Sequence, residues 1–296
     1  MCGISAVLGV SDSELARGMV RILSHRGPDG LRAWQDDHCS LGHSRLSIVD
    51  LAGSNQPIGS EHGCWLVQNG EIYNFRALRD AFSAYEWRTK GDAEVIIATH
   101  LNSVPPPTCA PAPVDRSSVK GWVRMTSDAE QSGNPAAKHV EWVSQLDGIW
   151  GFALWDSRHL ELVLCRDPLG VKPLLRTISP DGTLLVASEA KAFRAHEGYV
   201  PRIDENAMLA RLAFEYPLDE TTLFEGVGQV APGTIETWSL DSNGRATLTG
   251  IVTYSKDVVA PGDTWLPERD APFLLESLCE GIEQRLMSNV PLGIIL

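Results

Sequence analysis

The sequence has few of the features that mark exported, membrane-bound or nucleic-acid-binding proteins. No apolar run approaches the roughly 18 residues that a membrane span needs. The first twenty residues lack a basic segment followed by an apolar one and a small-residue cleavage site, so we expect no signal peptide and a cytoplasmic location. Lys and Arg form no cluster, and the formal net charge of −13 would repel phosphate backbones. We therefore expect neither nucleic acid nor a membrane as a partner.

Cysteines are few and form no metal-binding pattern. The six positions, 2, 39, 64, 109, 165 and 279, include no Cys-x-x-Cys pair. This spacing argues against a zinc site and, without an export signal, against a disulfide framework. We therefore expect no metal, and we interpret Cys39, Cys64, Cys165 and Cys279 as core residues.

Cys2 is the most informative residue that the sequence does contain. If Met1 is removed, Cys2 carries a thiol and a free α-amino group on the same residue. An α-amine of pKa about 8 can accept the thiol proton near neutrality without a separate histidine. Cys2 is thus a candidate nucleophile that supplies its own base. The alternative for Cys2 taken alone is an ordinary buried or lipid-modified cysteine.

The hydrophobic pattern predicts strands in adjacent groups, with helices between the groups. The predicted strands cover residues 3–10, 40–49, 64–69, 149–156, 160–166 and 184–188. Ser11 and Glu14 are placed as a capping box, Asn74 as the cap of a short helix, and Asp92 at the start of a helix over 93–101. This grouping favours stacked mixed or antiparallel sheets over a doubly wound parallel sheet.

Proline and small polar residues interrupt this pattern at 102–138, which we interpret as a flexible surface insertion. A proline-rich ligand for a polyproline-binding module is the alternative. Two further strands, 234–240 and 245–254, flank an Asn-Gly turn and should form a hairpin that closes the first domain. Pro272 then begins an amphipathic helix, and residues 291–296 begin an apolar strand.

Cleavage of an amide by a thiol needs oxyanion donors, groups that hold the substrate and a loop that excludes water. Asn69 and Gly70 could form an oxyanion hole, since glycine allows a close backbone approach. Arg45 could bind a carboxylate, and Glu71 or Asp92 an α-ammonium group. The loop 25–30 is a candidate lid. Each has an ordinary alternative when taken alone: a turn, a solvated charge or a plain connection.

Taken together, these segments resemble the glutamine-dependent asparagine synthetases in identity and order. The eight matching segments are Met1-Cys2-Gly3-Ile4, His25-Arg26-Gly27-Pro28-Asp29, Arg45-Leu46-Ser47-Ile48-Val49-Asp50, Asn69-Gly70-Glu71-Ile72-Tyr73-Asn74, Gly91-Asp92-Ala93-Glu94-Val95, Leu146-Asp147-Gly148, Arg166-Asp167-Pro168-Leu169-Gly170-Val171-Lys172-Pro173-Leu174 and Ala187-Ser188-Glu189-Ala190-Lys191-Ala192. Eight ordered matches over about 190 residues are far more specific than any one of them.

The resemblance implies an α+β fold, a four-layer αββα sandwich of the N-terminal-nucleophile hydrolase type. It implies a class II glutamine amidotransferase with Cys2, Asn69 and Gly70 as catalytic residues. The residues that it implies around bound glutamine are Arg45, Leu46, Ser47, Ile48, Val49, Asn69, Gly70, Glu71 and Asp92. No cofactor is implied for glutamine hydrolysis, whereas ATP and Mg would belong to a synthetase domain.

The implied domains are a glutamine amidotransferase over 2–215, a hairpin-containing connector over 216–271 and the start of an α/β synthetase domain over 272–296, expected as a helix-strand remnant. Three features depart from the family: the insertion at 102–138, Pro168, and a sequence that stops before the Ser-Gly-Gly-Leu-Asp-Ser loop expected to hold pyrophosphate. The apolar residues Leu278, Ile282, Leu286, Ile294 and Ile295 should then form an exposed patch.

The expected activity is hydrolysis of L-glutamine to glutamate and ammonia through a Cys2 thioester. The alternative is a non-catalytic glutamine-binding or regulatory partner of a full-length homologue, and a third is a poorly folding fragment of a misassigned gene. Self-association, or pairing with a synthetase domain, is expected from the apolar patch.

Overall fold

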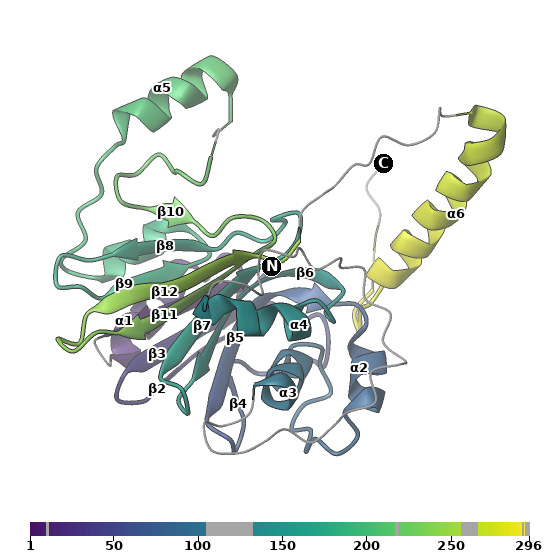
Figure 1. Ribbon diagram of the computed structural model, residues 1–296, viewed down its shortest axis with the longest axis horizontal. Coiled ribbons are helices and arrows are strands. Elements are labelled where there is room, and N and C mark those ends of the chain that lie inside the picture. The colour runs from purple at the N-terminus through teal and green to yellow at the C-terminus, as the bar shows by residue number, and fades with distance from the viewer. Residues whose placement is uncertain (10–11, 105–132, 217–218, 256–265, 292, 294–296) are drawn as a thin grey trace.

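Two antiparallel sheets, stacked face to face, form the body of the protein (Figure 1). The computed structural model describes residues 1–9, 12–104, 133–216, 219–255, 266–291 and 293. The first sheet has the strand order β10-β8-β9-β1-β3-β2, and the second has the order β12-β11-β7-β6-β5-β4.

The strands of the first sheet are β1 (Gly3–Leu8), β2 (Gly30–Gln35), β3 (Cys39–Arg45), β8 (Leu175–Ile178), β9 (Leu184–Ala187) and β10 (Gly228–Gln229). Those of the second are β4 (Ile58–Gly59), β5 (Cys64–Ile72), β6 (Gly148–Asp156), β7 (Glu161–Arg166), β11 (Thr234–Leu240) and β12 (Ala246–Thr253). Every described pairing between them is antiparallel, as the grouping of strands along the sequence indicates.

The central strand β1 is buried on both faces. Ile4, Ala6 and Leu8 belong to the core between the two sheets, where Trp155 of β6 also lies. Val7, which points the opposite way, packs in a separate core beneath the first helix. A strand covered on both sides reads as a continuous apolar run rather than an alternating one, and this explains the pattern that follows Cys2.

Helices cover the outer face of each sheet. α1 (Ser13–Ile22) and the short helix η2 (Ala190–Ala195) lie on the first sheet. α2 (Phe75–Ala81), α3 (Glu94–Ser103), η1 (Pro135–His139) and α4 (Val140–Val143) pack around the core of the second sheet. The four layers are therefore helix, sheet, sheet and helix, and the predicted αββα sandwich is confirmed.

Tertiary contacts change the roles of the polar residues predicted as helix caps. The cap of α1 is Asp12, whose Oδ1 accepts hydrogen bonds from the backbone N–H groups of Glu14 and Leu15; Ser11 lies outside the described residues. Asn74 precedes α2, but its side chain bonds Gln145 and Asp147 instead of the helix. Local spacing locates the helix starts, while distant partners compete for the capping side chains.

Both predicted hairpins form. β6 and β7 pair around a short turn, and β11 and β12 pair around Gly244, whose φ of +74° suits glycine. β11 also pairs with β7, so the second hairpin extends the second sheet, as expected for a hairpin that closes a domain. The division of the chain at 215 and 271 stays a prediction.

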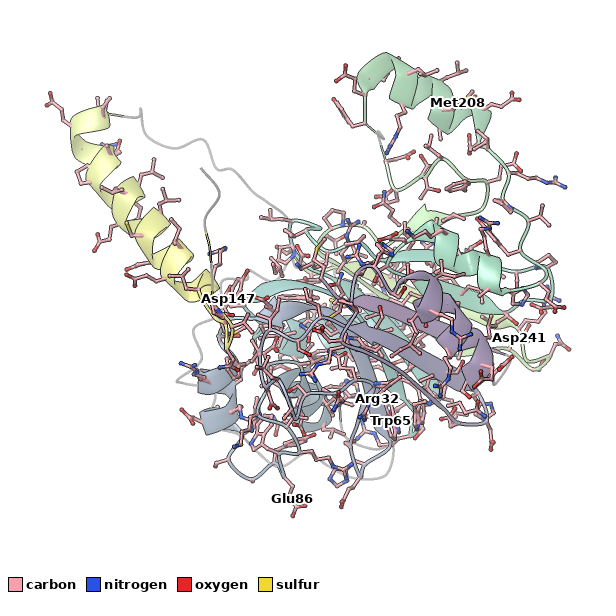
Figure 2. The ribbon with its side chains drawn as sticks, turned by 180° about the vertical axis from the view of Figure 1, so that it is seen from behind. Arg32, Trp65, Glu86, Asp147, Met208 and Asp241 are labelled. Carbon is pink, nitrogen blue, oxygen red and sulfur yellow. The ribbon has the colours of Figure 1, made fainter. Side chains whose placement is uncertain are left out.

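The two remaining helices, α5 (Glu205–Phe214) and α6 (Pro267–Arg285), bury no residue. They stand away from the sandwich in both views (Figures 1 and 2). α6 begins at Pro267, so the prediction that it starts at Pro272 is wrong, and Pro272 lies inside the helix. Cys279 is exposed on this helix, so its prediction as a core residue is also wrong; the amphipathic pattern has no covering surface in the described chain.

The apolar patch expected near the end of the chain is present on α6. Leu278, Ile282 and Leu286 are each more than half exposed. Ile294 and Ile295 lie outside the described residues, as does most of the predicted strand over 291–296 and of the insertion over 102–138. No helix among the described residues is both long and apolar enough to cross a membrane.

Candidate active site

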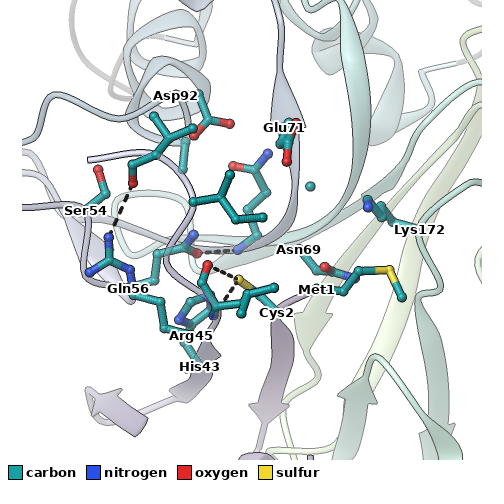
Figure 3. A pocket seen from close by; sticks show the side chains of 16 residues that line it. Met1, Cys2, His43, Arg45, Ser54, Gln56, Asn69, Glu71, Asp92 and Lys172 are labelled. Atoms are coloured by element: carbon teal, nitrogen blue, oxygen red, sulfur yellow. Dashed lines mark hydrogen bonds between the residues drawn. The ribbon is translucent and has the colours of Figure 1, made fainter. Parts of the chain in front are cut away.

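A pocket opens where β1, β3 and β5 come together, and it contains most of the predicted site residues (Figure 3). The residues that line it are Met1, Cys2, His43, Arg45, Leu46, Ile48, Val49, Ser54, Gln56, Gln68, Asn69, Gly70, Glu71, Asp92, Ala93 and Lys172. In the view of Figure 3, Glu71 and Asp92 lie at the end of the pocket opposite Cys2 and His43.

Cys2 lies just before β1, with its sulfur held against the residue that follows β3. Its Sγ accepts a hydrogen bond from the backbone N–H of Leu46 at 3.4 Å and lies 3.7 Å from the Leu46 carbonyl oxygen. Burial raises the pKa of the Cys2 thiol, and the Leu46 backbone contact opposes this rise only in part. The thiol is therefore protonated at neutral pH, so attack by this sulfur requires a nearby base.

The amino terminus of the structure belongs to Met1. Burial lowers the pKa of this amine below its usual 8.0, which favours the neutral form that can accept a proton. Met1 is 56% exposed, and it lines the pocket together with Cys2. Removal of Met1 would place an amine on Cys2 itself.

Arg26 holds the backbone of Cys2 in place. Its Nε donates to the Cys2 carbonyl oxygen at 2.9 Å, and its Nη1 donates to Glu189 at 2.8 Å. Although burial acts to raise it, hydrogen bonds from Arg26, Lys191 and His25 hold the pKa of Glu189 at about 2. The loop 25–30, expected as a lid, thus contains the residue that holds the Cys2 backbone; its role as a lid stays a prediction.

Asn69 and Gly70 lie within β5, which continues to Ile72, rather than in a turn. A side chain at Gly70 would meet the Ile149 carbonyl oxygen at 2.2 Å, so only glycine allows this approach to β6. The Asn69 Nδ2 is buried and has no hydrogen-bond partner among the described residues, although it lines the pocket. An unpaired buried donor beside Cys2 is suited to a developing oxyanion.

Arg45 uses its guanidinium to hold the loop that follows β3. Its Nη2 donates to the carbonyl oxygens of Asp50 at 2.6 Å and Val49 at 3.4 Å. Its Nη1 donates to the carbonyl oxygen of Leu51 at 3.0 Å and to Asn55 at 3.2 Å. The predicted bidentate contact with a substrate carboxylate would have to replace some of these bonds, and it stays a prediction.

Two carboxylates form the acidic end of the pocket. Burial raises the pKa of Asp92 to about 6, against the effect of the Ile72 N–H, which donates to its carboxylate at 2.9 Å; Glu71 contributes to the rise. Burial also raises the pKa of Glu71, while Lys172 opposes that rise. Two carboxylates whose pKa values are raised by burial would be stabilised in their charged form by a cationic ligand.

The structure places Ser47 elsewhere, since it does not line the pocket and its N–H donates to Asp29 at 2.7 Å. His43, Gln68 and Lys172 are pocket residues without a predicted role. His43 stands two residues before Arg45 on the same face of β3, a spacing that could have identified it. Burial and Arg45 lower the pKa of His43 to about 3, so this ring is neutral in the pocket.

A second group of polar side chains, Cys64, His100 and Asp156, lies buried in the core of the second sheet with ligand atoms within 4.8 Å of one another. Arg158 occupies the place of a cation there, since its Nε donates to Asp156 at 2.8 Å and its Nη2 lies 3.3 Å from the His100 Nε2. Burial raises the pKa of Cys64 well above its usual value, so this sulfur stays a thiol. We interpret the group as a buried ion-pair network that ties α3 to β6.

Comparisons with known proteins agree with this geometry. A family model described as a glutamine amidotransferase domain matches residues 1–104 and 124–247. The chain is 27% identical over 308 residues to asparagine synthetase [glutamine-hydrolyzing] 1 of Bacillus subtilis, which covers 100% of this chain and 42% of that protein. It is 36% identical over 200 residues to asparagine synthetase [glutamine-hydrolyzing] 3 of Arabidopsis thaliana, which covers 65% of this chain and 28% of that protein.

A solved structure, the glutamine phosphoribosylpyrophosphate amidotransferase from B. subtilis in complex with ADP and GMP, shares the fold. Its TM-score is 0.53 at 16% identity, and the match covers 86% of this chain and 50% of that one. The chain spans less than half the length of the two synthetases it matches. The family match over most of the chain and the shared sandwich lead to one conclusion: this chain belongs to the glutamine amidotransferase domain family.

Proposed function

We propose that this protein hydrolyses L-glutamine to glutamate and ammonia, with Cys2 as the nucleophile after removal of Met1. The observation that carries the proposal is a single pocket in which the Cys2 sulfur, the unpaired Asn69 amide and two carboxylates meet. A thiol, an oxyanion donor and an acceptor for an α-ammonium group are the parts that hydrolysis of glutamine requires.

The proposed first step is attack of the Cys2 sulfur on the side-chain amide carbon of glutamine. The α-amine of Cys2 takes the thiol proton, and the carbonyl oxygen becomes an oxyanion that Asn69 Nδ2 and the Gly70 N–H stabilise. The tetrahedral intermediate then collapses. The carbon–nitrogen bond breaks, the α-ammonium returns its proton to the leaving nitrogen, and ammonia departs from a thioester on Cys2.

Water completes the reaction. The α-amine accepts a proton from water as the oxygen attacks the thioester. The carbon–sulfur bond then breaks, the α-ammonium returns its proton to the leaving sulfur, and glutamate and the free thiol are formed. Glu71 and Asp92 bind the α-ammonium group of the substrate, and Arg45 binds its carboxylate in exchange for loop carbonyls. These steps use only side chains, backbone groups and water; ATP and Mg would serve a synthetase domain.

A decisive experiment joins N-terminal mass spectrometry with an assay for glutamate release. We expect the purified protein to begin at Cys2 and to form glutamate, and a glutamine-like electrophile to label Cys2. A variant that retains Met1 should bind glutamine without turnover, because its amine lies one residue away from the thiol. Equal activity of the Met1-retaining protein would contradict the proposed base.

A non-catalytic glutamine-binding role is the second candidate. The raised pKa of the buried Cys2 thiol favours it, because a protonated thiol is a weak nucleophile. The same experiment separates the two, since a binding protein would take up glutamine, release no glutamate and keep Met1. A cytoplasmic location, and self-association or pairing with a synthetase domain through α6, are further parts of the proposal.

A further inference from the structure

The segment that follows α6 returns to the rim of the pocket. The backbone N–H of Asn289 donates to the Ile48 carbonyl oxygen at 2.9 Å, and the side-chain Oδ1 of Asn289 accepts from the Asp50 N–H at 2.8 Å. Ile48 and Val49 line the pocket. Asn289 thus forms hydrogen bonds with both ends of the loop segment 48–50, which is part of the pocket wall.

Two neighbouring residues anchor the same segment to the sandwich. The Arg285 guanidinium lies 5.1 Å from the centre of the Tyr73 ring, and Tyr73 follows the pocket strand β5. Met287 packs against the core of the second sheet. Residues 285–289 are therefore attached, although the preceding helix α6 buries no residue and projects from the body (Figures 1 and 2).

The loop segment 48–50 needs such support. Asp50 has a φ of +46°, a left-handed conformation that is unfavourable for a residue other than glycine. From the pocket side, Arg45 holds the Val49 and Asp50 carbonyl oxygens. If Arg45 turns toward a substrate carboxylate, it gives up some of these bonds. The Asp50 carboxylate then still accepts hydrogen bonds from the Gly53 and Lys90 N–H groups and from the Ser54 hydroxyl. Asn289 keeps its bonds to both Ile48 and Asp50, and so holds the two ends of the segment together.

We infer that Asn289 is a positioning residue for the glutamine pocket, and that it keeps the segment 48–50 in the conformation that binds glutamine. This inference rests on the proposed function for its substrate, while the contacts that carry it belong to the loop itself.

The test compares Asn289→Ala with Asn289→Asp and with Ser288→Ala in the full chain. Alanine removes the acceptor of the Asp50 N–H, a loss of one hydrogen bond, so the KM for glutamine should rise about fivefold with kcat unchanged. Aspartate keeps an acceptor at this position and should restore the KM. Ser288 bonds only Val290 within this segment, so Ser288→Ala should behave as the unmodified protein.

Hydrogen exchange at the Asp50 amide gives a readout that does not depend on turnover. The exchange should be faster in Asn289→Ala than in Asn289→Asp or Ser288→Ala. If the unmodified protein releases no glutamate, the proposed function fails and exchange alone decides this inference. An unchanged KM in an active protein, an unchanged exchange rate, or an equal loss of kcat in all three variants would each overturn it.

Discussion

The two walls of the pocket are built in different ways. One wall is formed by the sheets, with Cys2 immediately before β1 and Asn69 and Gly70 inside β5. The other is the irregular segment 46–51, which is held by side-chain bonds from Arg45 and Asn289. Groups that take part in the chemical step need positions fixed to within a fraction of an ångström, and the sheet wall can supply such positions. The loop wall can instead change its conformation when a substrate binds.

The comparison predicts that changes in the sheet wall reduce turnover and that changes in the loop wall reduce affinity. The largest effect should come from Cys2→Ala, which removes the proposed nucleophile. Glutamate release should fall to the uncatalysed background, while glutamine binding measured by calorimetry should persist. Cys279→Ala, at an exposed cysteine on α6, is the matched control and should leave activity unchanged. Full activity in Cys2→Ala would end the proposed mechanism.

Asn69→Ala should have the next largest effect. It removes the proposed oxyanion donor from the sheet wall, so kcat should fall by roughly two to three orders of magnitude with little change in KM. Asn102→Ala, on α3 and outside the pocket, serves as the control. If Asn69→Ala changed only the KM, Asn69 would act in substrate binding and not in the chemical step.

Arg45→Ala tests the loop wall. The guanidinium holds four acceptors in the loop, and charged hydrogen bonds of this kind stabilise strongly, so the KM for glutamine should rise roughly ten- to a hundredfold, with a smaller change in kcat. Arg45→Lys should not restore the KM, because an ammonium group lacks the planar, forked N–H donors with which the guanidinium binds these acceptors. Arg32→Ala, at an exposed arginine on β2, is the control. Equal losses of kcat in Arg45→Ala and Asn69→Ala would contradict the claim that the loop wall affects affinity and the sheet wall affects turnover.

The smallest effect concerns pH and Asp92. Its pKa of about 6 means that the carboxylate loses its charge as the pH falls through 6, so the KM should rise below that pH. The stability of the protein without substrate depends on pH in the opposite direction. A carboxyl group whose pKa is raised in the folded state stabilises the fold at low pH, and this contribution to the free energy of unfolding is lost as the pH rises through about 6. Asp92→Asn should remove both dependences, whereas Asp37→Asn, at an exposed carboxylate outside the pocket, should remove neither. KM profiles and melting temperatures between pH 5 and pH 8 would check this prediction.

Most of the fold and most residues of the candidate site could be predicted from the sequence. The apolar runs mark the strands, the ordered motifs indicate the family, and Cys2, Arg45, Asn69 and Asp92 all line one pocket. The sequence misses Asn289, because a residue with an ordinary side chain in a short loop gives no local signal. The expectation for Cys279 fails for a related reason, since an amphipathic pattern does not show whether a covering surface is present.

The sequence by itself determines which segments become strands and which residues could carry the chemistry, because periodicity and residue type act over a few neighbouring positions. Only the tertiary structure decides which of those groups are left unpaired. Within the described part of the chain the Asn69 Nδ2 has no hydrogen-bond partner, the Arg45 guanidinium is bound to its own loop, and burial raises the pKa of Asp92 to about 6. Burial and hydrogen bonds between residues far apart in the chain set these properties, as in the bond from Asp50 to Asn289 across 239 positions.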